Sequence, residues 1–441
     1  MQDSFTSPIP PQPVPHGAPF RAAALAADAA PLGFRFARSA AAAGPAKLRQ
    51  ILARAARPGV ISFAIGQPAA ELLPAQALAA AQARVLPRLP AALQYSAPYA
   101  PLKAQIVELM ALRGVACTAE QVFLTSGSQQ GMDLLARLFV DPGGAVLLER
   151  TVYEGIHLAA GRLAPRLLAL PTQPETGLAV EAVEGWLARG IQPQLLYTIP
   201  CGHNPLGVTL SGAKRQRLVE LARDHRFPVL EDDAYGFLHY GESPSPPPLR
   251  ALDERWAIYL GSFSKILAPA LRAGWLVVPE ELIPRLSALK HATDLDTPSL
   301  SHRVISAYLE SGDLARHLAL LRAEYRRRRD TMLECLADSL PAGASWTLPE
   351  DGMFIWVELP KAIDAAALLE TAIETDGVAF SPGEAFAVGG GGHAAHCLRL
   401  CFASSPPDQI VEGIGRLGRT VARALDRDAA ADRPAGGGAA A

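Results

Sequence analysis

The run from Gly261 to Trp275 carries the side chains in this 441-residue chain that are most suited to chemistry. It brings Lys265 close in sequence to the hydroxyl of Ser262 and to Arg272. The run follows the apolar stretch 256–260, which has the pattern of a buried strand. A lysine delivered by such a strand is desolvated, which lowers its pKa and frees the amine for Schiff-base chemistry. A serine hydroxyl and a planar guanidinium are suited to binding a phosphate.

An amine beside a phosphate clamp is the combination that pyridoxal 5'-phosphate (PLP) requires. An isolated lysine after a strand has a simpler interpretation, an exposed loop residue, since Lys is almost always solvated. The prediction of a cofactor site therefore depends on the residues found at the ends of other strands.

Three further candidates lie at two such ends, where open α/β sheets bind their ligands. Ser128 and Gln129 follow the expected strand 122–125 in a glycine-containing turn, and the helix that begins there offers free N–H groups to an anion. Asp232 closes the expected strand 228–232, and a carboxylate facing a pyridine nitrogen keeps that nitrogen protonated. The alternative for Asp232 is a helix cap.

Four more polar or aromatic residues complete the candidate site. Tyr235 and Asn204 could both bond the phenolic oxygen of the cofactor, although an Asn-Pro pair is also an ordinary turn. Tyr153 offers a flat face for stacking on the ring, or is a packed core tyrosine. Arg399 lies in an apolar run and needs a partner, either a substrate carboxylate or a structural ion pair.

Composition excludes several other classes of protein. The net charge of -2 from 41 basic and 43 acidic residues gives no electrostatic footprint for nucleic acid. The five cysteines lack CxxC spacing, which argues against disulfides and against a metal site and is typical of a reducing cytoplasm. The apolar runs are short and interrupted, so we expect no membrane span, and the N-terminus lacks the pattern of a signal peptide.

Strand-like runs alternate with helical stretches, which predicts an α/β fold with a mostly parallel sheet. Strands are expected at 122–125, 145–148, 194–199, 228–232, 256–260, 275–278, 353–357 and 397–402, and helices at 212–226 and 313–340. We expect a large cofactor-binding domain at 70–310 and a smaller α+β domain formed by 311–425 together with 46–69. The Pro/Ala-rich segment 1–45 and the Ala/Gly-rich segment 426–441 are expected to be poorly ordered tails.

Taken together and in their order along the chain, these motifs resemble those of the class I aminotransferases of PLP fold type I. The similarity is greatest to the subgroup of kynurenine/2-aminoadipate aminotransferases and the aminotransferase-like domains of certain transcription regulators. It covers about residues 46–425. It rests on the motifs at 61–68, 93–95, 125–130, 197–200, 204–205, 231–235, 262–265, 272–274 and 398–400.

The resemblance implies roles around the cofactor ring. Lys265 would be the Schiff-base lysine, and Asp232 the partner of the ring nitrogen. Tyr153 would stack on the ring. Asn204 and Tyr235 would contact the phenolic oxygen, and Tyr235 would join Lys265 and Asp232 as the catalytic residues.

The resemblance also implies roles at the two ends of the site. The phosphate would be held by Ser128, Gln129, Ser262 and Arg272. Arg399 would hold the substrate α-carboxylate, with Gly66 and Asn204 nearby. The tyrosine matching Tyr95 contacts the cofactor of a neighbouring subunit in this family, so a homodimer is implied.

Three departures from the family pattern bear on specificity. Leu206 replaces the usual small hydroxyl residue after Asn-Pro, residues 201–203 replace a more polar or aromatic stretch, and the segment 95–101 is shorter. We expect them around the substrate or the dimer side of the site.

The sequence thus predicts a cytoplasmic, homodimeric PLP-dependent aminotransferase that moves an amino group from an L-amino acid to a 2-oxo acid, 2-oxoglutarate in the first instance. Two alternatives remain open at this point. One is a PLP-dependent lyase, decarboxylase or oxidase acting on an amino acid. The other is a non-catalytic PLP-binding regulator, although the first 45 residues have too little periodic apolar sequence for a winged-helix domain.

Overall fold

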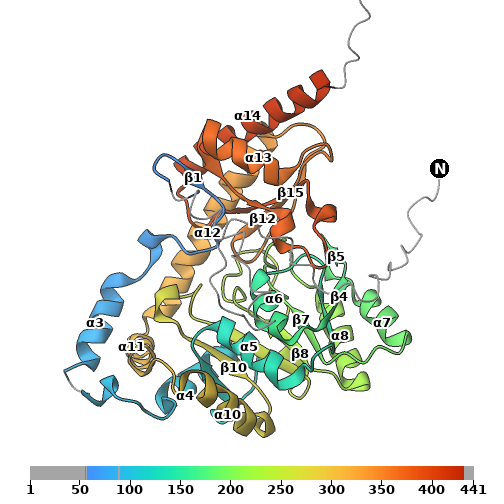
Figure 1. Ribbon diagram of the computed structural model, residues 1–441. Coiled ribbons are helices and arrows are strands. Elements are labelled where there is room, and N and C mark those ends of the chain that lie inside the picture. Colours follow the sequence, from blue (N-terminus) through green and yellow to red (C-terminus); the bar gives the residue numbers. More distant parts are fainter. Residues whose placement is uncertain (1–54, 56, 88–89, 432–441) are drawn as a thin grey trace, which may run out of the picture.

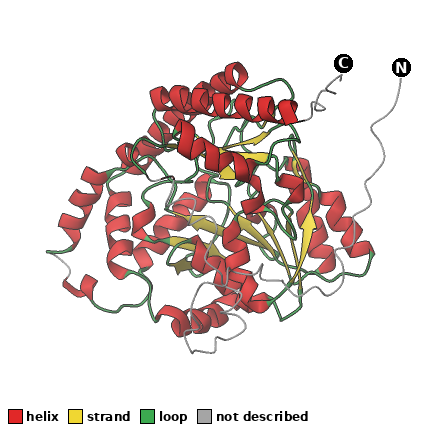
Figure 2. Ribbon diagram, turned by 45° about the horizontal axis from the view of Figure 1, so that its top comes forward, coloured by secondary structure: helices red, strands yellow, loops and turns green. Residues whose placement is uncertain are grey.

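The computed structural model describes residues 55, 57–87 and 90–431, and a seven-stranded sheet lies at the centre of its larger part (Figures 1 and 2). The strand order is β2 (Val122–Thr125), β10 (Gly274–Val277), β9 (Ala257–Ser262), β8 (Val229–Asp232), β7 (Leu195–Thr198), β3 (Ala145–Glu149) and β4 (Arg166–Leu170). Only β10 runs antiparallel to its neighbours. The predicted α/β class with a mostly parallel sheet is confirmed.

Successive side chains of the central strands point to opposite faces of the sheet, and both faces are buried. Leu147 of β3 packs into a core with α7 (Val180–Ala188), α8 (Gly212–His225) and α9 (Leu249–Leu252). Its neighbour Leu148 belongs to the core that includes α5 (Ser128–Phe139), α6 (Glu154–Ala160) and α10 (Ile283–Asp294). Because helices cover both faces, functional side chains can gather only at the strand ends.

A second group of elements lies above this sheet in Figure 1, drawn in orange and red. Its antiparallel sheet has the order β11 (Ser345–Trp346), β12 (Phe354–Glu358), β15 (Cys397–Cys401) and β14 (Ser381–Pro382). The helices beside it are α12 (Asp313–Ser339), α13 (Ala365–Thr371) and α14 (Pro407–Ala431). Near the N-terminus, β1 (Ile61–Ser62) pairs in parallel with β13 (Val378–Ala379), which ties residues 61–62 to this second group.

Several elements differ from the sequence-based expectation. The strand β4, the short strands β1, β13 and β14, and the hairpin of β5 (Thr172–Gln173) and β6 (Gly177–Leu178) were not predicted. The segment 426–431 is helical as the end of α14, not part of a disordered tail, because its alanines and charged residues favour helix. The rest of that tail, 432–441, and the predicted tail 1–45 lie outside the described residues. The domain boundary predicted at 310 falls between α11 (Ser299–Glu310) and α12 and stays a prediction.

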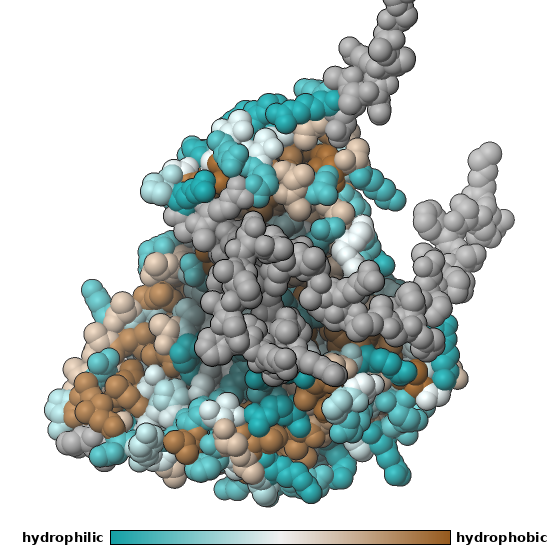
Figure 3. All heavy atoms as spheres, viewed as in Figure 1, coloured by the Kyte–Doolittle hydropathy of each residue, from teal (hydrophilic) through white to brown (hydrophobic). Residues whose placement is uncertain are grey.

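One edge of the molecule exposes apolar side chains. Figure 3 shows hydrophobic atoms gathered over the end of α3 (Ala75–Val85) and the segment that follows it before α4 (Ala100–Leu112). In that segment Leu93 is 69% exposed and Tyr95 is 82% exposed. Contiguous exposed apolar surface on a folded chain indicates an interaction site.

Candidate active site

Lys265 lies just beyond the end of β9, as its sequence position predicted. Its Nζ donates a hydrogen bond to the carbonyl oxygen of Gly66 at 2.6 Å. Burial lowers the pKa of Lys265 to about 8. At neutral pH a larger fraction of the molecules therefore carries the free amine than for an ordinary lysine. The alternative of a solvated loop lysine does not fit this environment.

Asp232 ends β8, directly beside the strand that carries Lys265. Its Oδ2 accepts a hydrogen bond from the hydroxyl of Tyr197 at 2.7 Å, whereas Oδ1 is buried without a partner among the described residues. Burial raises the pKa of Asp232 to about 6, against the lowering effect of the Tyr197 hydrogen bond. No helix begins at Asp232, so it is not a helix cap. A buried acceptor with no donor fits the protonated ring nitrogen of PLP.

The phenols of Tyr153 and Tyr235 lie in the electrostatic field of Asp232. Tyr153 stands immediately before α6, and Tyr235 is buried with its ring at a right angle to that of Phe354, 5.8 Å between centroids. Burial first, and then Asp232, raises the pKa of both hydroxyl groups. Both phenols therefore keep their protons at neutral pH and can donate hydrogen bonds.

The predicted phosphate ligands meet where three neighbouring strands end. Gly274 of β10 is paired with Thr125 on one side and with Ser262 on the other, which brings the turn at 126–128 beside Ser262. Gly127 has a φ of +90°, and a Cβ built on it would lie 2.7 Å from Nη2 of Arg272. Only glycine suits this position, both for its backbone angle and for the approach of the guanidinium.

Ser128 and Gln129 occupy different surroundings within this turn. Ser128 is the first residue of α5, so its N–H lies among the free donors of a helix N-terminus. Gln129 instead donates from Nε2 to the carbonyl of Gly155 in α6 at 2.8 Å. Gln129 therefore links α5 to the helix that follows Tyr153.

Arg399 projects from β15 of the second group into the same region. Its Nη1 donates to Oδ1 of Asn204 at 2.8 Å and its Nη2 to the carbonyl of Ala64 at 2.6 Å, while Nε is buried without a partner among the described residues. The rings of Phe354 and Phe386 lie 4.3 Å and 4.7 Å from the guanidinium carbon. All hydrogen-bond acceptors found for it in the described part of the chain are neutral, so its charge is available to an anionic substrate.

Gly66 and Asn204 both lie beside Arg399, and Gly66 also accepts the hydrogen bond from Lys265. A Cβ on Gly66 would lie 2.7 Å from the ring of Phe354, so a side chain there would displace that ring from the guanidinium. The peptide bond between Asn204 and Pro205 is cis. Tyr95 is 82% exposed, and its role beside a neighbouring subunit stays a prediction.

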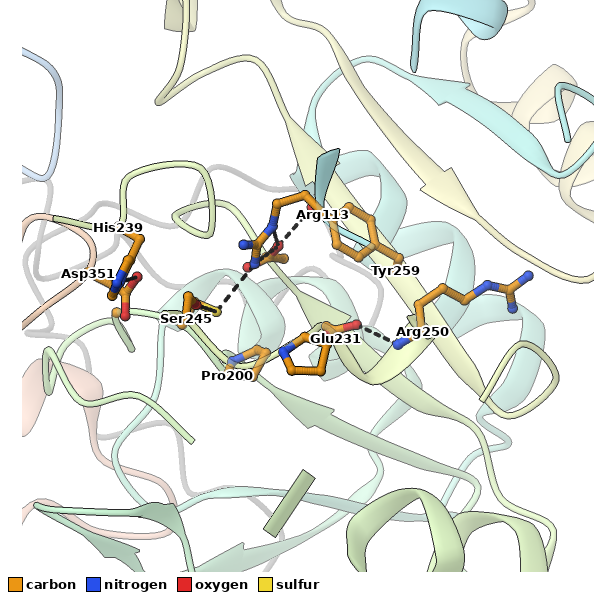
Figure 4. A network of polar contacts seen from close by, with 12 residues as sticks. Arg113, Pro200, Glu231, His239, Ser245, Arg250, Tyr259 and Asp351 are labelled. Carbon is orange, nitrogen blue, oxygen red and sulfur yellow. Dashed lines mark hydrogen bonds and ion pairs between the residues drawn. The ribbon is translucent and has the colours of Figure 1, made fainter. Parts of the chain in front are cut away.

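A network of buried polar contacts, shown in Figure 4, holds the two carboxylates that flank Asp232. Arg113 donates from Nη2 to Oδ2 of Asp233 at 3.0 Å, and the hydroxyl of Tyr259 donates to the same oxygen at 2.8 Å. Glu231 accepts from the backbone N–H groups of Leu249 and Arg250. Hydrogen bonds thus hold the side chains on both sides of Asp232 in place.

The sequence-based reasoning missed several residues that shape the site, namely Tyr197, Phe354, Phe386, Arg113 and Asp233. Tyr197 lies in a predicted strand beside the strand that ends at Asp232. Its polar hydroxyl in an otherwise apolar run could have indicated a role near the site. The others act across long sequence distances that a single sequence does not reveal. The described ranges contain no cluster of His, Cys, Asp and Glu able to hold a metal ion, and no helix in them is long and apolar enough to cross a membrane.

Comparisons with known proteins identify the family of the chain. A model of the family described as aminotransferase class I and II matches residues 38–417. The chain is 39% identical over 380 residues to the 2-aminoadipate transaminase of Thermus thermophilus, covering 85% of this chain and 93% of that protein. It is 37% identical over 386 residues to aromatic-amino-acid aminotransferase 1 of Thermococcus litoralis, covering 85% and 91%. The crystal structure of α-aminoadipate aminotransferase from Thermus thermophilus, complexed with N-(5'-phosphopyridoxyl)-L-leucine, has a TM-score of 0.82 at 36% identity and covers 89% of this chain and 98% of that one.

Proposed function

Because the chain belongs to the class I and II aminotransferase family and is a PLP-dependent aminotransferase, we propose that Lys265, Asp232 and Tyr235 are its catalytic residues. The observation that carries this assignment is the unpartnered Oδ1 of Asp232, a buried acceptor beside a lysine of lowered pKa. When bound, PLP accepts the amino group of the donor and stabilises the charge left at its Cα.

The surrounding residues would hold the cofactor by its ring and by its phosphate. Asp232 would accept a hydrogen bond from the protonated ring nitrogen, Tyr153 would pack on the ring, and Asn204 and Tyr235 would contact its phenolic oxygen. The phosphate would be held by the N-terminus of α5, which begins with Ser128 and Gln129, together with the side chains of Ser262 and Arg272. A helix N-terminus and a guanidinium together favour a dianion.

Lys265 would also move the proton at the substrate. With a pKa of about 8, its Nζ can remove a proton from the substrate Cα at neutral pH. The same amine can then deliver that proton to the C4' position of the cofactor. Arg399 binds the α-carboxylate and thereby fixes which bond at Cα faces Lys265. The closed packing of Phe354 and Phe386 around the guanidinium excludes water from that ion pair.

The test of this assignment is Lys265→Ala, with Lys361→Ala at an exposed lysine as the matched control. We expect Lys265→Ala to abolish both transamination and the absorbance of covalently attached cofactor, while Lys361→Ala keeps both. Normal transamination by Lys265→Ala would refute the assignment.

The acceptor and the donor are proposed as 2-oxoglutarate and an L-amino acid with a large side chain. The named relatives act, by their names, on aromatic amino acids and on 2-aminoadipate. Leu206 packs with an apolar cluster that includes Trp356 and Phe386, so the departure at this position places hydrophobic surface behind Arg399. A panel of amino donors assayed against 2-oxoglutarate and pyruvate decides both assignments. Transamination with pyruvate alone would overturn the proposed acceptor.

The assembly and location are proposed as a homodimer in the cytoplasm. The exposed apolar segment around Leu93 and Tyr95 supports the dimer, in which Tyr95 would contact the cofactor of the second copy. All five cysteines are free, as expected of a protein in a reducing compartment. The larger domain would comprise residues 70–310, and the smaller domain 311–425 with 46–69.

A further inference from the structure

Asp294, the last residue of α10, contacts the phosphate-binding turn from a distant part of the sequence. Its Oδ2 accepts hydrogen bonds from the hydroxyl of Ser126 at 3.1 Å and from Nε2 of Gln130 at 2.6 Å, across 168 and 164 residues. One carboxylate oxygen therefore joins the residue before Gly127 to the first turn of α5. The motif at 125–130 gave no indication of this partner.

Ser126 is fixed by all of its polar groups. Its N–H donates to Oε1 of Gln130 at 2.9 Å, and its carbonyl accepts from Nη2 of Arg272 at 3.2 Å. With the hydroxyl bound to Asp294, neither the backbone nor the side chain of Ser126 can turn without breaking a hydrogen bond. Gly127 and Ser128 follow directly, so the direction of their N–H groups depends on these bonds.

Lys290 makes this arrangement compatible with a nearby anion. Its Nζ lies 2.6 Å and 2.7 Å from the two carboxylate oxygens of Asp294, one helical turn away on α10, and Lys290 is buried. Burial tends to raise the pKa of Asp294, but the hydrogen bonds from Lys290, Gln130 and Ser126 outweigh it and lower that pKa. Asp294 is therefore a carboxylate, and its salt bridge to Lys290 offsets its charge, so Asp294 can anchor the turn without repelling a phosphate.

We propose that Asp294, held by Lys290, is a positioning residue for cofactor phosphate binding and acts through Ser126 and Gln130. The inference rests on the proposed function, since it takes the turn at 126–128 as the phosphate site. It concerns only the phosphate end of the cofactor, because none of its hydrogen bonds reaches Lys265 or Asp232.

The test measures dissociation constants of the apoprotein for PLP and for pyridoxal, which lacks the phosphate. We expect Asp294→Ala to weaken PLP binding by about 10- to 100-fold, as loss of an outer-shell partner does at metal sites, and to leave pyridoxal binding nearly unchanged. Ser126→Ala removes one of the two bonds and keeps the Lys290–Asp294 pair intact. It should shift the ratio of the two constants in the same direction by a smaller factor, even if Asp294→Ala folds poorly.

The chain offers a matched control in the residue next to Asp294. Thr293 accepts a hydrogen bond from Nη1 of Arg137 at 2.7 Å, so it also links α10 to α5 but far from the phosphate turn. Thr293→Ala should leave both constants unchanged.

Three results would overturn the inference. The first is PLP binding of wild-type strength in both Asp294→Ala and Ser126→Ala. The second is an equal loss of PLP and pyridoxal affinity, which would make the pair a support of the whole fold. The third is a wild-type protein that binds neither compound, which alone would also refute the proposed function.

Discussion

The buried carboxylate of Asp232 illustrates, at the scale of one residue, how a binding group can oppose the stability of the chain that carries it. One of its oxygens has a partner and the other has none, and its pKa is raised from 3.8 to about 6 mainly by burial. An acid whose pKa is higher in the folded state binds its proton more tightly there. It therefore destabilises the folded apoprotein increasingly from about pH 4, and fully above pH 6.

We expect Asp232→Asn to stabilise the apoprotein at pH 8 by about 2 kcal/mol while it weakens PLP binding, because the neutral amide avoids burying a charge but loses the ion pair with the protonated ring nitrogen. Urea unfolding of the apoprotein measures the first effect, and titration with PLP the second. Repeating the unfolding at pH 4 should remove most of the gain. A stabilisation of equal size at both pH values would show that the carboxylate charge is not its cause.

At the scale of elements, the loop 201–207 and the segment before β12 meet with almost no room between them. Gly202 has a φ of +54°, and a Cβ on it would lie 2.8 Å from the carbonyl carbon of Asp351. Asp351 is itself held, since Thr209 donates to its Oδ2 at 2.7 Å and His239 lies 2.9 Å from its Oδ1 (Figure 4). Phe354, which covers Arg399, follows shortly after this contact.

Gly202→Ala should therefore lower the free energy of unfolding by about 2 kcal/mol or more and raise the KM for the amino donor, because the clash displaces the backbone that leads to Phe354. The control is Gly190→Ala. Gly190 also has a positive φ, +77°, but nothing lies within 4 Å of a Cβ there, so the variant carries only the backbone strain of about 1 kcal/mol. Equal effects of the two variants on KM would contradict the proposed link between this contact and the substrate site.

The same scale shows what a single sequence can and cannot predict. The strands β2, β3, β7, β8, β9 and β10 were predictable because each contains a short apolar run and is buried along its whole length. The strand ends indicated where candidate residues lie, whereas the roles of those residues came from the resemblance to the family. The two-residue strands β1, β13 and β14 have no periodicity to detect. Contacts such as that between Ser126 and Asp294 depend on how α10 packs against α5, which no local pattern encodes.

For the whole molecule, the segment around Leu93 and Tyr95 exposes apolar side chains that no other described part of the same chain covers. A solvent-exposed leucine and tyrosine in one short segment are consistent with a surface that a second copy covers. The short segment 95–101, noted as a departure from the family pattern, adjoins it.

We expect Leu93→Glu to shift the protein from dimer to monomer and to reduce activity, because a charge would be desolvated in the interface. Sedimentation equilibrium over a range of protein concentrations measures the assembly. Leu348, 72% exposed and far along the chain, supplies the control Leu348→Glu, which should change neither property. A wild-type chain that is monomeric at all concentrations would contradict the dimer.

The pairing of β1 with β13 has a consequence for the order in which the molecule can be completed during synthesis. Gly66, which meets Lys265, lies just after β1, and Arg399 reaches back 335 residues to the carbonyl of Ala64. The central sheet can form once β10 has been translated. Arg399, the residue proposed to bind the substrate carboxylate, joins the site only after β15 has also left the ribosome. Closing so long a loop is among the slower steps of folding. A nascent chain therefore carries the reactive lysine long before it has the means to select a substrate.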